Sequence, residues 1–423
     1  MDKPIIFYGA GKEAESAQFL LEKFDPICFV DKDSSKYSRL FMGKKVIPFK
    51  QAMDEYPDSL FYITTSKYKH EIISELLSHD ITNERIINYD AVTERFGCKI
   101  LEHRAGIGYV DGHFRIGFCC GIAGHQNYPG ITVYLDMQPG NYERIAQYVK
   151  TERNRIISSL GEDAHVCKGC PNLEYGFFTD RKTISLLTNP LPLVCNCKCF
   201  YCNNPMRIRP NLPKSELKKI DNFDFAALAE SFERYGLMNT KATYGWTAGE
   251  ISVAKHKESF LDFAKCHTVF ILSNALVYDG LIAEWMSDSS SNGYLNVSLD
   301  SGTQETFRRI KGVDAYDRVC ENVVKYGVNR EKGLELKYVF CEGYNDNDRD
   351  VDGFFEIAKA ANASCVVMER NFFDLEKPLK ETTIKAAARF YVSAINNAIQ
   401  LITGESFTRK QATSIHSTAH MPA

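Results

Sequence analysis

Long apolar runs are missing from this sequence of 423 residues, and no stretch approaches the ~20 residues that a membrane-spanning helix needs. The apolar segment before Gly9 is too short for the apolar region of a signal peptide. An excess of basic charge is also absent, because the formal net charge is −3. This balance gives no reason to expect nucleic acid or an anionic membrane as a partner. We therefore expect a cytoplasmic protein.

The sequence also has no internal repeat and no low-complexity tract. Its hydrophobic content of 44% and charged content of 25% are typical of globular proteins. At ~100–200 residues per domain, the length predicts two or three domains, each with a buried core.

Strand and helix patterns alternate over much of the chain, which predicts an α/β fold. Residues 1–95 read as a Rossmann-like parallel-sheet domain, and residues 96–182 as a small cysteine-containing domain. Residues 183–375 read as a partial or complete (β/α)6 barrel of the TIM type. Residues 376–423 should form a helix over 382–401 and a disordered tail. The six barrel strands are expected at 183–187, 241–245, 268–272, 294–298, 334–340 and 364–368.

Cysteine is plentiful, with 14 residues, although disulfides are disfavoured in the cytosol. Clustered cysteines there indicate metal or cluster ligands first. Isolated cysteines in apolar stretches, such as Cys28 and Cys365, read as small buried hydrophobic residues. The clustered ones are Cys119 with Cys120, Cys167 with Cys170, and Cys195 with Cys197, Cys199 and Cys202.

The last group contains the pattern Cys-x3-Cys-x2-Cys, formed by Cys195, Cys199 and Cys202. Three thiolates on a short loop can bind three irons of a cubane [4Fe-4S] cluster and leave the fourth iron open. Zinc is the main alternative, although structural zinc ligands usually come as two separated pairs. A redox-reactive loop without metal is a third interpretation.

With the aromatic Tyr201 before the last cysteine, this pattern resembles the signature of the radical S-adenosylmethionine (radical SAM) superfamily. The resemblance implies that the open iron binds S-adenosylmethionine. It also implies that one electron, from a reductant such as flavodoxin or ferredoxin, cleaves this cofactor to a 5′-deoxyadenosyl radical. The radical then abstracts hydrogen from a substrate. Cys197 lies outside the superfamily spacing and is not expected to be a ligand.

Polar residues at the ends of the later predicted strands extend the resemblance. Gly249 and Glu250 are similar to a segment that contacts the amino group of S-adenosylmethionine, and Ser273 with Asn274 to a further contact. Ser298 and Asp300 are similar to residues that contact its ribose and carboxylate, and Lys337 is a candidate carboxylate partner. Taken singly, Glu250 could instead cap a helix near Ser252, and Asp300 could begin a turn.

The second cysteine set comprises Cys119, Cys120, Cys167 and Cys170. Two distant thiolate pairs suit a tetrahedral site or a cluster. The segment resembles SPASM-type extensions, which implies an auxiliary [4Fe-4S] cluster, although here it precedes the barrel. Structural zinc and unligated thiols remain alternatives, and Cys98 could replace one of the adjacent cysteines.

Near the N-terminus, Gly9-Ala10-Gly11 follows a predicted strand and opens a helix, as in the dinucleotide fingerprint. Asp31 ends the next strand, where a carboxylate would bind ribose hydroxyls. A possible nucleotide site is therefore expected, with a purely docking domain as the alternative. The segment resembles N-terminal domains of bacterial sugar-modifying proteins, which suggests a nucleotide-linked sugar or another small-molecule or carrier-bound substrate.

Three hypotheses follow for the function of the whole chain. The first is a radical SAM enzyme acting on such a small or carrier-bound metabolite. The second is a radical SAM enzyme that modifies peptides. The third, from another class, is a zinc-stabilised nucleotide-binding module without catalysis.

Overall fold

The computed structural model describes residues 3–16, 21, 24–37, 39–65, 67–82, 85–88, 92–118, 132–135, 141–162, 167–168, 170, 172–179, 183–202, 209–328, 330–375, 377–404 and 406–419. The chain divides into two compact units. Unit 1 comprises residues 1–98 and 156–182, and unit 2 comprises residues 99–155 and 183–423. The expected small domain at 96–182 is thus divided between the two units. No helix of the described residues is long and apolar enough to cross a membrane.

Unit 1 is built on a six-stranded sheet in the order β3-β4-β2-β1-β5-β6. Every neighbouring pair is parallel except β3 with β4, which is antiparallel. The parallel strands follow the mononucleotide-binding order of Rossmann folds, as expected. The strands are β1 (Ile5–Tyr8), β2 (Cys28–Val30), β3 (Leu40–Phe41), β4 (Lys44–Ile47), β5 (Leu60–Ile63) and β6 (Ile86–Asn88).

Both faces of this sheet are covered, because alternate residues of its strands enter two separate apolar clusters. Ile6 and Phe61 belong to one cluster, and Phe7 and Tyr62 belong to the other. Burial on both faces explains why these strands read as continuous apolar runs. The helices are α1 (Lys12–Ser16), α3 (Phe49–Glu55) and α4 (Lys69–Ser78), and a separate antiparallel pair joins β7 (Val92–Gly97) to β11 (Glu174–Thr179).

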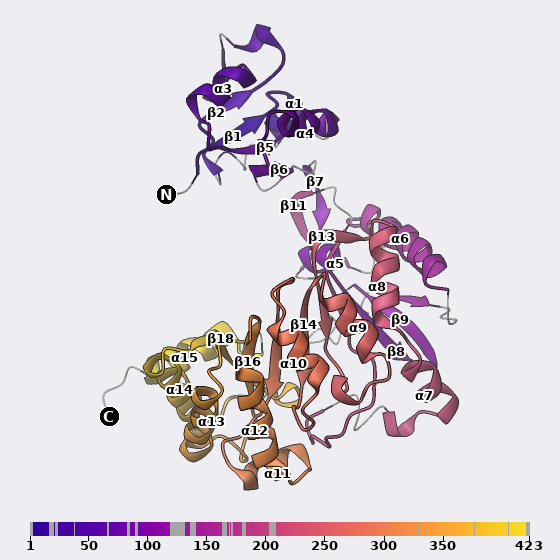
Figure 1. Ribbon diagram of the computed structural model, residues 1–423, viewed down its shortest axis with the longest axis vertical. Helices are drawn as coiled ribbons and strands as arrows, with labels where there is room; N and C mark the ends of the chain where they lie inside the picture. Colours follow the sequence, from indigo (N-terminus) through magenta and orange to yellow (C-terminus); the bar gives the residue numbers. More distant parts are fainter. Residues whose placement is uncertain are drawn as a thin grey trace. The chain divides into compact units, whose positions relative to one another are not determined.

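Unit 2 contains a ten-stranded sheet in the order β10-β9-β8-β12-β13-β14-β15-β16-β17-β18. The six expected barrel strands are confirmed as β12 to β17, and all neighbours from β8 to β18 are parallel. Among the described residues β10 and β18 do not pair, so the barrel is partial (Figure 1). The strands are β8 (Arg104–Val110), β9 (His113–Gly117), β10 (Thr132–Leu135), β12 (Ile184–Asn189), β13 (Met238–Trp246), β14 (Thr268–Ser273), β15 (Gly293–Ser298), β16 (Gly333–Phe340), β17 (Cys365–Arg370) and β18 (Gln400–Thr403).

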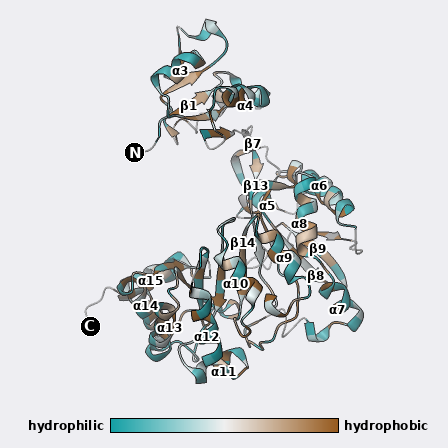
Figure 2. Ribbon diagram, viewed as in Figure 1, coloured by the Kyte–Doolittle hydropathy of each residue, from teal (hydrophilic) through white to brown (hydrophobic). Residues whose placement is uncertain are grey.

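Helices cover this sheet, and their polar sides contrast with the apolar strands (Figure 2). After β12, strand–helix units repeat along the chain, which gives the expected TIM-type arrangement. The helices are α5 (Lys99–His103), α6 (Tyr142–Ser158), α7 (Lys214–Asp221), α8 (Phe225–Arg234), α9 (Lys257–Ala264), α10 (Gly280–Ser287), α11 (Gln304–Lys311), α12 (Tyr316–Gly327), α13 (Asp348–Ala360), α14 (Glu381–Asn396) and α15 (Arg409–Ala419).

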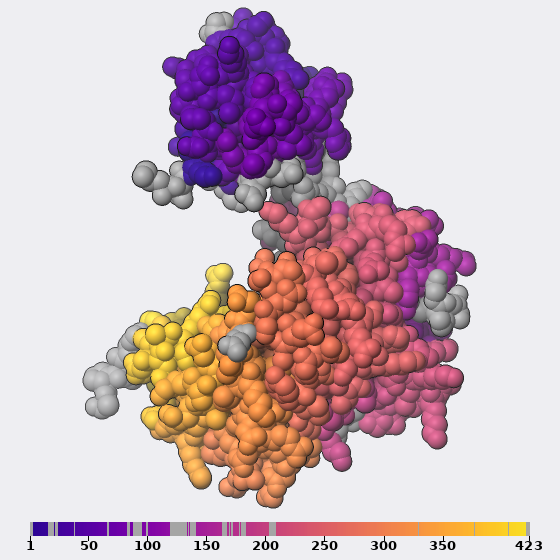
Figure 3. All heavy atoms as spheres, viewed as in Figure 1, coloured from indigo at the N-terminus to yellow at the C-terminus, as the bar shows by residue number. Residues whose placement is uncertain are grey.

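The C-terminal segment corrects the expectation of one long helix and a disordered tail. Helix α14 ends at Asn396, and Ala398 then adopts a positive φ of 53° that no helix continues through. The chain next forms β18 beside β17, and α15 packs on α14 in the yellow part of Figure 3. His416 lies within α15, whereas His420 is outside the described residues.

Candidate functional site

The cysteine-bearing loop, residues 193–202, leaves the carboxyl end of β12 and is held by two other segments. The Glu250 N–H donates to the Val194 carbonyl at 2.8 Å, and the Lys198 N–H donates to the Lys311 carbonyl at 2.8 Å. Gly249 makes the first approach possible, since it has a φ of 67° and a Cβ there would lie 2.6 Å from Leu193 Cβ. The predicted site residue Gly249 therefore has a structural reason to be glycine.

Gly312 makes the second approach possible in the same way. Its φ is 66°, and a Cβ there would lie 2.8 Å from the Lys198 carbonyl oxygen. The loop thus rests, near Val194 and at Lys198, on backbone that only glycine brings close enough.

The four cysteines of this loop fall into two environments. Cys195, Cys199 and Cys202 are partly exposed, whereas Cys197 is only 3% exposed. Burial raises the pKa of Cys195 to about 11. The Cys197 thiol, together with the Lys311 ammonium, lowers the pKa of Cys199 to about 7. The buried cysteine, Cys197, is the one that is not part of the pattern Cys-x3-Cys-x2-Cys.

The donor set fits an iron–sulfur cluster. Three partly exposed thiols on one loop can each bind a separate iron, as the protein ligands of a cubane do. Among the described residues no three cysteine, histidine or carboxylate side chains meet around a single metal ion. A cubane does not require such convergence, because its thiolates bind different irons.

Glu250, Ser273 and Asn274 are brought together, as predicted, at the carboxyl ends of β13 and β14. The fully buried Glu250 carboxylate accepts hydrogen bonds from Ser273 Oγ at 2.9 Å and from the Asn274 N–H at 2.7 Å. It also accepts from the backbone and hydroxyl of Ser252, so it caps the short helix Ile251–Val253. Burial raises the pKa of Glu250. The Glu250 carboxylate therefore links the carboxyl ends of β13 and β14 by hydrogen bonds.

Asn274 extends this arrangement to the cysteine loop. Its Nδ2 donates to Asn196 Oδ1 at 2.7 Å and lies 3.6 Å from Cys195 Sγ. A second-shell donor of this kind orients a ligand sulfur.

Asp300 lies beside the loop, but its carboxylate is already used by the protein. Its Oδ2 accepts hydrogen bonds from the Tyr201 hydroxyl and the Lys311 ammonium, and its Oδ1 accepts one from the Val339 N–H at 2.8 Å. The aromatic Tyr201 is held by the same contacts. The sequence did not point to Lys311, because it ends a helix whose last turn is basic and reads as solvated.

Ser298 and Lys337 are neighbours in the register of β15 and β16. Both are partly buried. Burial lowers the pKa of Lys337, and its ammonium group has no hydrogen bond or ion pair among the described residues. Lys337 is therefore available to an anionic group at this site.

A cavity of about 300 Å³ opens beside the loop, at the carboxyl ends of β16 and β17. Its aromatic wall is formed by Phe200 and Tyr344, whose rings stack at 4.7 Å. Glu342 also lines it, with Lys380 at 3.5 Å and Arg370 at 3.8 Å, and its Oε1 has no hydrogen-bond partner among the described residues. The sequence analysis did not select Phe200, Tyr344 or Lys380.

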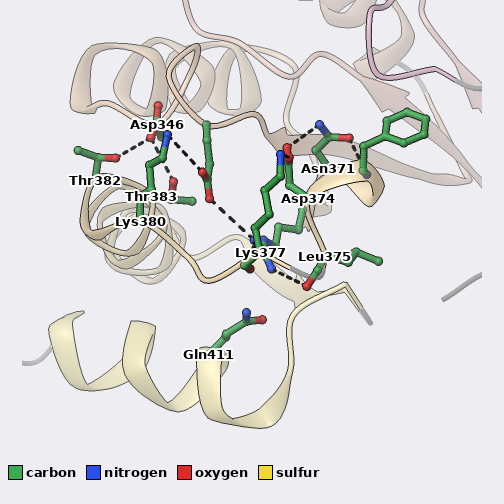
Figure 4. Close-up of polar contacts among 12 residues, drawn as sticks. Asp346, Asn371, Asp374, Leu375, Lys377, Lys380, Thr382, Thr383 and Gln411 are labelled. Carbon is green, nitrogen blue, oxygen red and sulfur yellow. Dashed lines mark hydrogen bonds and ion pairs between the residues drawn. The ribbon is translucent and has the colours of Figure 1, made fainter. Parts of the chain in front are cut away.

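The rim of this cavity is tied together by polar contacts (Figure 4). Asp346 accepts hydrogen bonds from Thr382 at 2.7 Å and Thr383 at 3.1 Å, which joins the loop after β16 to the start of α14. Asp374 accepts from Asn371 Nδ2 at 2.8 Å and from Lys377 Nζ at 2.6 Å. Asn371, Asp374 and Lys377 line the cavity, so this part of its lining is held in place by hydrogen bonds.

Unit 1 has its own cavity, of about 450 Å³, at the carboxyl ends of β1, β2 and β5. The predicted residues Gly9, Gly11 and Asp31 all line it. Gly9 has a φ of 115°, and a Cβ there would lie 2.8 Å from Thr64 Oγ1. A Cβ on Gly11 would meet nothing within 4 Å, so this glycine leaves open space. Asp31 Oδ2 accepts from the Ala10 N–H at 2.8 Å and from Lys36 at 2.9 Å.

The second cysteine set is described only in part. The Cys170 N–H donates to the Cys167 carbonyl at 2.9 Å, which forms a turn just before β11. Cys98 follows β7 at the end where Gly97 pairs with Glu174, so it lies at the same end of this strand pair. Cys119 and Cys120 are outside the described residues.

Comparisons by sequence return nothing for this chain. No protein-family model matches it, and a search of curated proteins finds no relative.

Comparisons by structure return distant similarities to solved proteins. SuiB from Streptococcus suis bound to its precursor peptide SuiA has a TM-score of 0.40 and 11% identity, over 77% of this chain and 75% of that one. TYW1 with a lysine-pyruvate adduct bound has a TM-score of 0.36 and 18% identity, over 52% and 77%. A radical SAM methyltransferase from Sphaerobacter thermophilus has a TM-score of 0.34 and 15% identity, over 50% and 63%. Because these TM-scores are low, the proposed function is based on the residues of the site and not on the similar structures.

Proposed function

We propose that unit 2 is a radical SAM enzyme in which Cys195, Cys199 and Cys202 hold a [4Fe-4S] cluster. The observation that supports this most strongly is the contrast within the loop, where these three thiols are partly exposed and Cys197 is buried. When bound, the cluster supplies an open iron for S-adenosylmethionine and the electron that cleaves it to a 5′-deoxyadenosyl radical.

The chain's own residues then hold and orient the reacting groups. The buried Glu250 fixes the ends of β13 and β14, and Asn274 directs its amide toward Cys195. Lys337 is the proposed partner of a carboxylate, because its ammonium lacks a partner among the described residues and burial makes its charge costly without one. Gly249 permits the close backbone approach on which the loop depends.

The cavity beside Phe200 is the proposed place for a small or carrier-bound substrate. Glu342 lines the cavity as a carboxylate that is ion-paired with Arg370 and Lys380, and Phe200 with Tyr344 offers a flat aromatic wall. A sugar ring, such as that of a nucleotide-linked sugar, matches both features, because its hydroxyl groups complement the carboxylate and its carbon face complements the aromatic wall. Incubation with perdeuterated nucleotide sugars tests this, because hydrogen abstraction transfers deuterium to 5′-deoxyadenosine. An unlabelled product with every sugar would contradict this substrate class.

The cavity of unit 1 is proposed as a nucleotide site. Gly11 leaves space for a phosphate beside the chain, and Asp31 is fixed at the end of β2, where ribose hydroxyls bind in such folds. Titration calorimetry with ADP, UDP and NAD measures this directly. No heat change with any of the three would favour a docking role for this unit.

An auxiliary cluster at Cys119, Cys120, Cys167 and Cys170 is proposed with zinc as the alternative metal. The turn between Cys167 and Cys170 supports a paired-ligand arrangement on that side. Cys167→Ala should then lower the iron or zinc content per chain while the loop cluster of unit 2 still assembles. Metal analysis of that variant distinguishes the two metals.

The experiment that tests the main proposal is anaerobic reconstitution with iron and sulfide, followed by iron counting and a dithionite assay for 5′-deoxyadenosine. About four irons with deoxyadenosine formation would support one cubane, and about eight would add the auxiliary cluster. Zinc without iron, and no deoxyadenosine, would refute the proposal and favour a zinc-stabilised nucleotide-binding module.

A further inference from the structure

A buried pair of opposite charges lies against the cysteine loop. The Lys311 side chain is 1% exposed and the Asp300 side chain is 0% exposed, and the Lys311 ammonium donates to Asp300 Oδ2. Lys311 also donates to the Tyr201 hydroxyl at 3.0 Å, and that hydroxyl donates to the same Asp300 oxygen. Burying two such charges costs several kcal/mol per ion before their attraction is counted, so the pair is weak evidence for stability alone.

The backbone of the same helix end holds the loop on both sides of Cys199. The Lys198 N–H donates to the Lys311 carbonyl at 2.8 Å, and the Phe200 N–H donates to the Ile310 carbonyl at 3.2 Å. Tyr201, the next residue, is bound to Lys311 and Asp300 through its hydroxyl. Cys199 is therefore the loop cysteine whose position depends most directly on Lys311.

Each charge of the pair acts on Cys199 with the opposite sign. Both charges lie against the segment that carries Cys199, because Tyr201, two residues further on, contacts the Lys311 ammonium and the Asp300 carboxylate through its hydroxyl. A positive charge near a cluster favours the reduced form, which carries one more electron, and a negative charge disfavours it. Removing one charge of the pair would leave the other uncompensated beside the loop.

We propose that Lys311 and Asp300 are positioning residues that hold the cysteine loop and set the reduction potential of the cluster through their opposed charges. This inference rests on the proposed function. Asp300 then acts on the reaction through the loop, since both of its carboxylate oxygens already have protein partners.

The test is an anaerobic redox titration of the reconstituted full chain, followed by electron paramagnetic resonance of the reduced cluster. At a fixed potential, Lys311→Met should lower the ratio of reduced to oxidised cluster about tenfold, which is 59 mV for one electron. Asp300→Asn should raise the ratio by a similar factor, and the double variant should return close to the wild type. Lys311→Arg keeps the charge and should change the ratio little.

Lys385→Met is the matched control, because Lys385 pairs with Glu381 on the exposed face of α14. Shifts of the same sign in Lys311→Met and Asp300→Asn, or none in chains that carry the cluster, would overturn the inference and leave the proposed function intact. If Lys311→Met fails to fold, the sign of the shift in Asp300→Asn decides. A wild-type chain that binds no iron would refute the proposed function and the inference with it.

Discussion

The two units place their candidate sites at the same kind of position and build them from different parts of the chain. In unit 1, the cavity at the ends of β1 and β2 is shaped by main chain, through Gly9 and Gly11. In unit 2, the loop after β12 rests on main chain at Gly249 and Gly312, and buried side chains support it as well, above all Glu250 and the pair formed by Lys311 and Asp300. Glycine spacing is visible in the sequence, whereas the support that Lys311 gives to the loop is visible only after folding.

The largest expected effect is the loss of the proposed reaction of unit 2 through a change that does not alter unit 1. Cys199→Ala removes a proposed cluster ligand and should abolish formation of 5′-deoxyadenosine from S-adenosylmethionine. Cys197→Ala removes a buried thiol that is not a proposed ligand and should keep most of that activity. The dithionite assay on both reconstituted variants checks this. Retained activity in the first, or complete loss in the second, would mean that the ligands are assigned wrongly.

The next effect tests whether unit 2 depends on buried side chains. Glu250→Ala leaves the donors of Ser252, Ser273 and Asn274 without their acceptor, which should destabilise the chain by about 3–5 kcal/mol. Glu284→Ala is the control, because Glu284 is largely exposed and makes only a 3.9 Å contact with Lys265. Urea unfolding of both variants measures the difference. Equal unfolding midpoints would show that Glu250 does not support the site.

A smaller effect tests the main-chain site of unit 1 with two glycines that differ in surroundings. Gly9→Ala strains a residue with a φ of 115° and meets Thr64, so it should cost about 1–3 kcal/mol. Gly11→Ala meets nothing within 4 Å and should leave the stability of the chain unchanged. It should nevertheless weaken nucleotide binding, because the new methyl group occupies the open space. Thermal unfolding and calorimetry separate the two effects; an unaltered affinity in Gly11→Ala would argue against a phosphate at that position.

The same contrast explains what the sequence could and could not predict. The six barrel strands and the Rossmann-like sheet followed from apolar patterns, whereas Glu250 and Asn274 were selected at strand ends because of the family resemblance. Lys311 was missed because a basic last helical turn is normally solvated, and only the docked loop buries it. Strand β18 was missed because its four residues are mostly exposed and carry no strand pattern.

One missed element did carry a sequence signal. Strands β8 and β9 are joined at Asp111-Gly112, where both residues have positive φ, and Val110 pairs with His113. Asp-Gly between two alternating segments is a strong hairpin signal. Reading it would have added this hairpin to the barrel sheet.

The smallest expected effect concerns a residue where the side-chain site of unit 2 uses alanine in place of a glycine. Ala275 follows Asn274 with a φ of 53°, a conformation that costs a residue with a Cβ roughly 1 kcal/mol relative to glycine. Ala275→Gly relieves this strain but removes a buried methyl group, so its stability should stay within about 1 kcal/mol of the wild type. Ala242→Gly removes a similarly buried methyl group from β13 without any such relief. It should therefore unfold at a urea concentration clearly below that of Ala275→Gly, and equal midpoints would mean that the positive φ of Ala275 stores no strain beside the cysteine loop.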